Sequence, residues 1–200
     1  YGPDVIKVDR EQWENNPRPR ENILERVERD AKIFQKRGET RSILLCFVTD
    51  PFQPIEDKYH ITTQTIQILH KYNQRVTILT KAGRRAMQGI HLLTPGRDTF
   101  AVTLTLLDAK ESQKWEPFAG LPDDRILNLQ IAKGAGLETW VSCEPVINPQ
   151  ITLKIIEKTV SFVDTFKVGT MNYHPIAEQI DWRDFARRAK RLLESLHVNY

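Results

Sequence analysis

Five short apolar segments, separated by stretches with helical periodicity, constrain the fold of this chain more than any other feature. Each segment is rich in β-branched and aromatic residues, which favour strands. Most of them do not alternate cleanly between apolar and polar residues, a pattern typical of strands in a parallel sheet that is covered on both faces. We therefore expect five parallel strands. The segments are SILLCFV at residues 42–48, RVTILT at 75–80, FAVTLTLL at 100–107, LETWVS at 137–142 and DTFKVG at 164–169.

Helices are predicted between these strands, because apolar residues recur there every three or four positions. Gly38 and Gly136 follow two of the helices as stop signals, and Asp181 is placed to cap the last one. The strands start roughly 25–35 residues apart, the size of a βαβ unit, which indicates an α/β fold with right-handed crossovers. Open doubly wound sheets and closed or partial barrels both satisfy this pattern. The predicted helices span residues 20–37, 62–72, 123–135, 152–160 and 181–196.

Length, charge and cysteine content limit the class of protein. Two hundred residues suit a single domain over residues 1–200, with the helical C-terminal segment 181–200 packing on it. The net charge of +3 neither requires nor excludes an acidic partner such as nucleic acid. No apolar run approaches the roughly 20 residues of a membrane span, so no membrane partner is expected. The two cysteines, Cys46 and Cys143, form no disulfide framework and suit a cytoplasmic protein.

Polar residues follow the carboxyl end of each predicted strand. In parallel α/β folds these ends gather at one edge, where ligands bind. Lys81 suits a carboxylate or phosphate, Asp50 or Glu144 suits an ammonium group, and threonine hydroxyls suit a sugar. Together they predict a mouth for a small zwitterionic or polyhydroxylated ligand. The residues placed at this edge are Thr49, Asp50, Gln53, Thr80, Lys81, Thr103, Thr105, Glu144, Asn172 and Tyr173.

Each of these residues also has an ordinary structural explanation. Asp50 can open a turn, Lys81 can be a solvated surface lysine, and Glu144 can belong to an extended dipeptide before a proline. A lone histidine beside a proline, such as His174, is more often structural than catalytic. The coincidence of so many polar residues at one predicted edge nevertheless favours a binding site. The sequence shows no glycine-rich phosphate loop, dinucleotide fingerprint, serine nucleophile elbow or paired-histidine metal motif.

Five strings, in order along nearly the whole chain, carry a resemblance to a known family. They are VTDPFQPIE at residues 48–56, TKAGRRA at 80–86, VTLTLLD at 102–108 followed by WEP and Arg125, VSCEPVINP at 141–149, and FKVGTMNYH at 166–174 followed by DWRDF. With these strings the chain resembles radical S-adenosylmethionine (SAM) proteins of the spore photoproduct lyase-like group, often labelled DNA repair photolyases. The TDP-Q-P-E pattern of the first string is the most specific element.

The resemblance implies a partial (β/α)6 TIM-like barrel of the radical SAM type. In that family a [4Fe–4S] cluster held by three cysteines binds SAM, and reductive cleavage gives a 5′-deoxyadenosyl radical that abstracts hydrogen from a substrate. The implied protein is a lyase-like radical SAM enzyme, served by an electron donor such as flavodoxin or ferredoxin. Its substrate is unknown, with nucleic acid as one candidate partner.

The resemblance also implies roles for individual residues, while the catalytic residue itself stays unassigned. In the cofactor site, Thr49 and Asp50 would bind the amino group of SAM with Gln53 beside them, and Lys81 would bind its carboxylate. Thr103 and Thr105 would face the ribose, and Arg125 would reach SAM or pair with Glu116. Glu144 would meet the adenosyl end or the substrate, and Asn172 and Tyr173 would line the substrate side.

The sequence departs from this family at the cluster. The family's three cysteines, spaced C-x3-C-x2-C, are absent, and Cys46 and Cys143 are too far apart to supply them. The expectation is that Tyr1 follows the last cluster cysteine, so that no metal ligand lies in this chain and the cluster loop and first barrel strand lie upstream. The five predicted strands would then be the second to sixth of the barrel. Such a fragment would be inactive by itself.

Two alternatives of other classes stay open. One is a radical-independent (β/α)-barrel enzyme whose mouth binds a phosphate or sugar, with Lys81 and Arg84 as anchors. The other is a non-catalytic nucleic-acid-binding module that uses basic residues of the last predicted helix. The sequence favours a solvated helix face over nucleic-acid binding for these basic residues, because no aromatic residues are interleaved with them. They are Arg183, Arg187, Arg188, Lys190 and Arg191.

Overall fold

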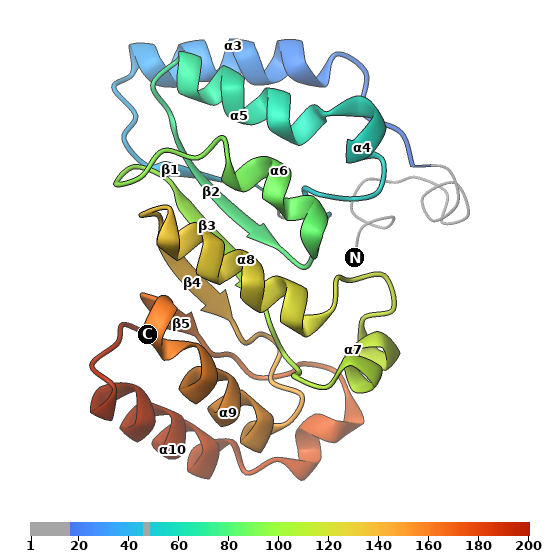
Figure 1. Ribbon diagram of the computed structural model, residues 1–200, viewed down its shortest axis with the longest axis vertical. Coiled ribbons are helices and arrows are strands. Elements are labelled where there is room, and N and C mark those ends of the chain that lie inside the picture. The colour runs from blue at the N-terminus through green and yellow to red at the C-terminus, as the bar shows by residue number, and fades with distance from the viewer. Residues whose placement is uncertain (1–16, 46–48) are drawn as a thin grey trace.

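One sheet of five parallel strands forms the centre of the computed structural model, which describes residues 17–45 and 49–200 (Figure 1). The strands lie side by side in the order in which they occur along the chain. This arrangement confirms the prediction of a parallel α/β sheet. The strand β2 coincides with its predicted segment, whereas β3, β4 and β5 are shorter than theirs, and the predicted segment of β1 runs on into residues 46–48, which lie outside the described residues. The strands are β1 (Ser42–Leu45), β2 (Arg75–Thr80), β3 (Thr99–Thr103), β4 (Glu138–Ser142) and β5 (Thr165–Lys167).

The five predicted helices are present, one before the first strand and the others between and after the strands. The fourth begins earlier than predicted, because Asn148 caps it by accepting hydrogen bonds from the backbone N–H groups of Gln150 and Ile151. Asp181 caps the last helix as predicted. These helices are α3 (Ile23–Lys36), α5 (Ile61–Lys71), α8 (Pro122–Gly134), α9 (Pro149–Thr159) and α10 (Trp182–Ser195).

Short helical elements in the connecting loops were not predicted. Their sequences are too brief to show a helical period, and most follow the carboxyl end of a strand. Asp108 caps one of them, α7, by accepting a hydrogen bond from the N–H group of Glu111. The short helices are α4 (Glu56–Tyr59), α6 (Met87–Ile90) and α7 (Ala109–Trp115), with 3₁₀ turns η1 (Arg84–Ala86), η2 (Val160–Phe162) and η3 (Pro175–Gln179).

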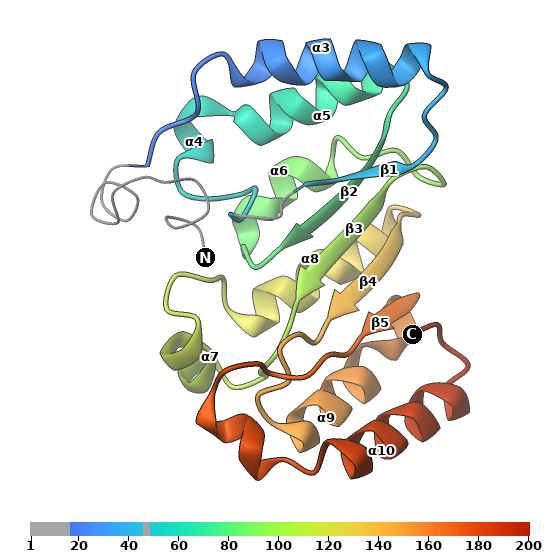
Figure 2. The same cartoon turned by 180° about the vertical axis from the view of Figure 1, so that it is seen from behind.

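In the part of the chain that the structure describes, the helices lie on one face of the sheet, and Figure 2 shows the strands from the other face. Helices of the described residues therefore cover only one of the two faces of the sheet. Along β2, Val76 and Ile78 are buried toward the helices, whereas Thr77 between them points to the opposite face. Threonine is itself a common strand residue, and it hid this alternation in the sequence.

The hydrophobic core fills the space between the sheet and the helices. Phe100, Val141 and Phe166 come from the strands and meet Leu129 and Ile156 from α8 and α9. At the C-terminal end, α10 packs against α9 in a smaller apolar cluster. No helix among the described residues is long and apolar enough to cross a membrane. The core thus fixes the strands, and their carboxyl ends present the polar residues described next.

Candidate functional site

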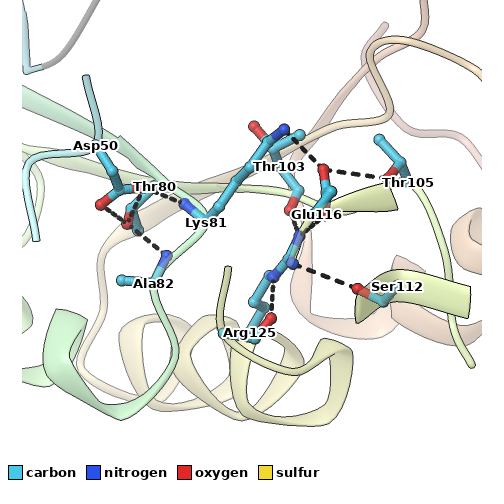
Figure 3. Close-up of polar contacts among 10 residues, drawn as sticks. Asp50, Thr80, Lys81, Ala82, Thr103, Thr105, Ser112, Glu116 and Arg125 are labelled. Carbon is cyan, nitrogen blue, oxygen red and sulfur yellow. Dashed lines mark hydrogen bonds and ion pairs between the residues drawn. The ribbon is translucent and has the colours of Figure 1, made fainter. Parts of the chain in front are cut away.

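Asp50 fixes the turn that follows β2 (Figure 3). One carboxylate oxygen accepts hydrogen bonds from the N–H group of Phe52 at 2.9 Å and from the hydroxyl of Thr80 at 2.8 Å. The other oxygen accepts a hydrogen bond from the N–H group of Lys81 at 2.6 Å. Both oxygens are thus used within the protein, so Asp50 ties its own loop to the end of β2. Recognition of a ligand ammonium group by Asp50 stays a prediction.

Lys81 extends from this turn toward the loop that follows α7. Its ammonium nitrogen lies 2.7 Å from Oε1 of Glu116. Oε2 of Glu116 lies 2.8 Å from Nη1 of Arg125, which completes a chain of three charges at the carboxyl ends of β2 and β3 (Figure 3). The Lys81 side chain is 40 % exposed and that of Glu116 only 9 %. Lys81, Glu116 and Arg125 thus form a charge chain, and the Lys81 ammonium group is its solvent-facing end.

Arg125 holds the opposite, buried end of the charge chain. Its side chain is 1 % exposed, and α8 presents it to two neighbouring segments. Nη1 donates to the carbonyl of Thr103 at 2.9 Å, and Nε donates to the carbonyl of Gly120 at 2.7 Å. Of the two roles predicted for Arg125, the structure shows the ion pair with Glu116. Arg125 therefore connects the end of β3 to the loop between α7 and α8.

The electrostatics of Glu116 follow from these partners. Burial raises the pKa of the Glu116 carboxyl, but the nearby Lys81 and Arg125 outweigh this effect and hold the pKa below its usual value. Glu116 is therefore an anion at neutral pH, and the charge chain carries one net positive charge. Such a cluster attracts an anionic group of a ligand to the exposed ammonium.

Two glycines bring the charged residues together. The N–H group of Gly120 donates to the carbonyl of Lys81 at 2.8 Å, which docks the α7–α8 loop on the turn after β2. Gly83 lies so close to Gly120 that any side chain at position 120 would collide with its backbone. The side-chain amide of Asn128 in α8 donates to the carbonyl of Gly83 at 2.8 Å and so joins the same turn to α8.

The predicted threonines lie beside this charge chain. Thr103 ends β3 and Thr105 follows two residues later, and both side chains are buried. The hydroxyl of Thr105 makes a long 3.5 Å contact with Oε1 of Glu116. Thr103 and Thr105 thus neighbour the Lys81–Glu116 pair, as the prediction of one shared edge requires.

Glu144 lies at the same edge, after β4. It is exposed, and one of its oxygens accepts a hydrogen bond from the Ser142 hydroxyl at 3.3 Å. The carboxylate lies against the backbone of Gly169 after β5, where an added Cβ would come within 2.4 Å of Oε1. The end of β5 therefore leaves room for this carboxylate.

The remaining predicted residues lie on flanking loops. Thr49 and Gln53 are half-buried on either side of Asp50. Asn172 and Tyr173 follow β5 and are exposed, with Tyr173 99 % exposed. Neither is brought against the charge chain, so their substrate role stays a prediction. His174 is structural, because its Nδ1 accepts a hydrogen bond from the Ile176 N–H group and caps η3.

The cysteines offer no site for a metal cluster in the described residues. Burial in the core, followed by the neighbouring Glu144 carboxylate, raises the pKa of the Cys143 thiol to about 12. Cys46 lies outside the described residues, as do Tyr1 and Val48. Within residues 17–45 and 49–200, no three His, Cys, Asp or Glu side chains are grouped as metal ligands would be. Cys143 is therefore a packing residue.

Several residues that carried the two alternative functions have partners within the protein. Arg84 is 84 % exposed and lies 3.4 Å from Asp124 of α8. On α10, Arg187 and Arg188 pair with Asp184 one turn earlier. These contacts match a solvated helix face, the explanation that the sequence already favoured for the basic residues.

Glu116 is the site residue whose contact with Lys81 was not predicted from the sequence. It was predicted only as an alternative partner for Arg125, and the structure makes it the partner of Lys81 as well. The WEP string was the available signal, since its glutamate precedes a proline as Glu144 does after β4. Taken together, the edge presents the Lys81 ammonium group and the exposed Glu144 carboxylate, and Glu116 and the threonines lie buried beside them.

Comparison with known proteins shows a shared fold. No protein-family profile matches the chain, and no curated protein sequence matches it. Among solved structures, Streptococcus suis SuiB bound to S-adenosylmethionine matches with a TM-score of 0.64 and 16 % identity, over 92 % of this chain and 41 % of that chain. SuiB alone gives a TM-score of 0.68 at 15 % identity, over 92 % and 43 % of the two chains. SuiB bound to its precursor peptide SuiA gives 0.67 at 15 % identity, over 92 % and 42 %. The chain thus spans about two fifths of the SuiB chain.

Proposed function

We propose that this chain is the SAM-binding part of a radical SAM protein. One observation carries the proposal: the Lys81 ammonium group is held at the carboxyl edge of a sheet whose fold is shared with SuiB, a protein observed with S-adenosylmethionine bound. The carboxyl edge of a parallel sheet is where such folds bind ligands. The sequence resemblance to radical SAM proteins, which includes the string that contains Lys81, leads to the same ligand.

The proposed architecture is a partial (β/α)6 barrel in which β1 to β5 are the second to sixth strands. Two observations support it: the strands are parallel and in sequence order, and the helices of the described residues lie on one face. The opposite face carries a shallow hollow of about 350 Å³, which suits the interior of an incomplete barrel. The lining residues are Leu44, Thr77, Thr99, Glu138, Trp140, Thr165 and Lys167.

The donor set at the edge fits SAM. Lys81 would bind the carboxylate of the ligand, Thr103 and Thr105 the ribose, and Glu144 the adenosyl end. Asp50 would shape the loop that carries Thr49 and Gln53 at the same edge. A reduced [4Fe–4S] cluster, held by residues outside this chain, would supply the radical chemistry. The contribution of this chain is to orient the ligand and to exclude water from it.

The residues of this chain do not fit the [4Fe–4S] cluster itself. A cluster of this type is held by thiolates, and the high pKa and burial of Cys143 disqualify it. The proposal requires the cluster cysteines to be supplied by sequence other than these 200 residues.

Within the superfamily, the strings that include Thr49–Glu56 favour the spore photoproduct lyase-like group. That assignment brings lyase-type radical chemistry in the cytoplasm, an electron donor such as flavodoxin or ferredoxin, and nucleic acid as one candidate substrate. The paired basic residues of α10 give nucleic acid no added support. A fold by itself does not determine the substrate, so the radical SAM assignment is tested first.

The test is anaerobic iron–sulfur reconstitution of the full-length protein, followed by an assay for 5′-deoxyadenosine. We expect a brown protein that forms 5′-deoxyadenosine from SAM only when a reductant is added. Replacing Lys81 by Met should lower SAM affinity while the protein keeps its iron content, since Lys81 is assigned to the ligand. A colourless protein that does not cleave SAM would refute the proposed function.

A further inference from the structure

The exposed end of the charge chain presents two opposite charges side by side. The ammonium nitrogen of Lys81 and Oε1 of Glu116 are 2.7 Å apart. A lysine ammonium group has three N–H donors, and Glu116 uses one of them. The other two remain for a ligand anion, which would bind directly beside the Glu116 carboxylate.

Glu116 is held too firmly to move aside for such an anion. Its second oxygen pairs with the buried Arg125, which is itself bonded to the carbonyls of Thr103 and Gly120. The Gly120 backbone is in turn bonded to the carbonyl of Lys81. A ligand therefore meets the Lys81–Glu116 pair as a unit, with positions fixed before binding.

This fixed pair discriminates between kinds of anion. A phosphate group at Lys81 would bring two negative charges against the Glu116 carboxylate, and like charges in close contact are unfavourable. The amino acid group of a zwitterion brings one negative charge to Lys81 and a positive charge that Glu116 attracts.

We infer that Glu116 is a specificity-determining residue, which makes the Lys81 site select zwitterionic amino acid groups over phosphate. The inference deepens the proposed function and rests on it, because it takes SAM as the ligand. It also gives a reason for the buried Arg125, which keeps Glu116 ionised and immobile.

The experiment compares three adenosine derivatives by calorimetry on the reconstituted full-length protein. S-adenosylhomocysteine carries the zwitterionic group, 5′-methylthioadenosine lacks it, and adenosine monophosphate replaces it with phosphate. We expect the wild-type protein to bind S-adenosylhomocysteine at least tenfold more tightly than either of the others. Glu116→Gln should reduce the preference over adenosine monophosphate at least tenfold. Lys81→Met should bring S-adenosylhomocysteine to the affinity of 5′-methylthioadenosine.

Glu111→Gln is the matched control, since Glu111 is an exposed carboxylate on α7, the helix that precedes Glu116. It should leave all three affinities unchanged. If Glu116→Gln unfolds the protein by leaving Arg125 buried without its partner, Glu116→Gln with Arg125→Gln removes both charges and should show the same loss of preference.

The outcomes separate the inference from the function on which it rests. A wild-type protein that prefers S-adenosylhomocysteine, with the preference unchanged within twofold in the Glu116 variants, overturns the role of Glu116 and leaves the proposed function intact. A wild-type protein that binds none of the three adenosine derivatives overturns both the role of Glu116 and the proposed function.

Discussion

A Cβ atom on Gly120 would lie 2.1 Å from the backbone nitrogen of Gly83, so these two glycines pack backbone against backbone. The contact joins the α7–α8 loop to the turn after β2, and it sets the distance between Glu116 and Lys81. The geometry of the candidate site therefore depends on two residues that carry no functional group.

Replacing Gly120 by Ala should destabilise the protein by about 1–3 kcal/mol, the usual range for overpacking a close contact. Because the displaced atoms belong to backbone, the loop must move, and the Lys81–Glu116 ion pair should separate. Urea denaturation measures the loss, and SAM affinity should fall with it. Gly134→Ala is the control, because an added Cβ at the end of α8 meets no atom within 4 Å. Equal stability of the two variants would contradict the packing role.

Replacing Arg125 by Met should be far more damaging than replacing Arg84 by Met. Arg125 is buried, and its removal takes away the cation paired with Oε2 of Glu116 and the donor to the Thr103 carbonyl. Breaking a buried ion pair in this way typically costs about 3–5 kcal/mol. Arg84 is exposed and makes a 3.4 Å contact with Asp124, a type of pair worth at most about 1 kcal/mol. Denaturant midpoints of the two variants provide the measurement. Similar midpoints would argue against the assigned role of Arg125, which is to connect the end of β3 to the loop between α7 and α8.

The predicted strands and main helices were accessible from sequence because they depend on local periodicity. The end of β2 at Thr80 and the cap at Asp181 are local features of this kind. The partner of Lys81 was not accessible, because Glu116 reaches it only after the Gly83–Gly120 contact docks two loops. Loop packing between distant segments has no periodic signature in the sequence.

Asp50 illustrates a second limit of sequence reasoning. Its position after a strand correctly placed it at the carboxyl edge of the sheet, beside the end of β2. The sequence could not show that Phe52, Thr80 and Lys81 would use both carboxylate oxygens, since hydrogen-bond partners depend on the path of the loop. Position along a strand predicts where a side chain lies better than it predicts the group that it binds.

Cys143 should be unreactive in the folded protein. The thiolate is the reactive form, and burial raises the pKa of this thiol to about 12. In a Cys46→Ser background, which leaves one thiol in these 200 residues, a disulfide reagent at pH 8 should label Cys143 only after denaturation. Rapid labelling of the native protein would show that Cys143 is accessible and would reopen a chemical role for it.

The charge chain should make stability depend on acid pH. The pKa of Glu116 is lower in the folded protein than its ordinary value of 4.5, because Lys81 and Arg125 outweigh the effect of burial, which raises it. The unfolded chain therefore binds a proton at Glu116 more readily than the folded protein does. It follows that the stability contributed by ionised Glu116 is complete above about pH 5 and is lost as the pH falls through the folded-state pKa.

Glu116→Gln cannot make this transition, so its free energy of unfolding should fall less than that of the wild type between pH 7 and pH 3. Urea denaturation at intervals across that range gives both curves. The pKa of Asp164 is also lowered, since hydrogen bonds from Lys133 and Thr139 outweigh its burial, but this group is common to both proteins and cancels in the difference. Glu111→Gln, which changes an exposed carboxylate, should follow the wild-type curve. Parallel curves for Glu116→Gln and the wild type would show that Glu116 is not held as an anion by Lys81 and Arg125.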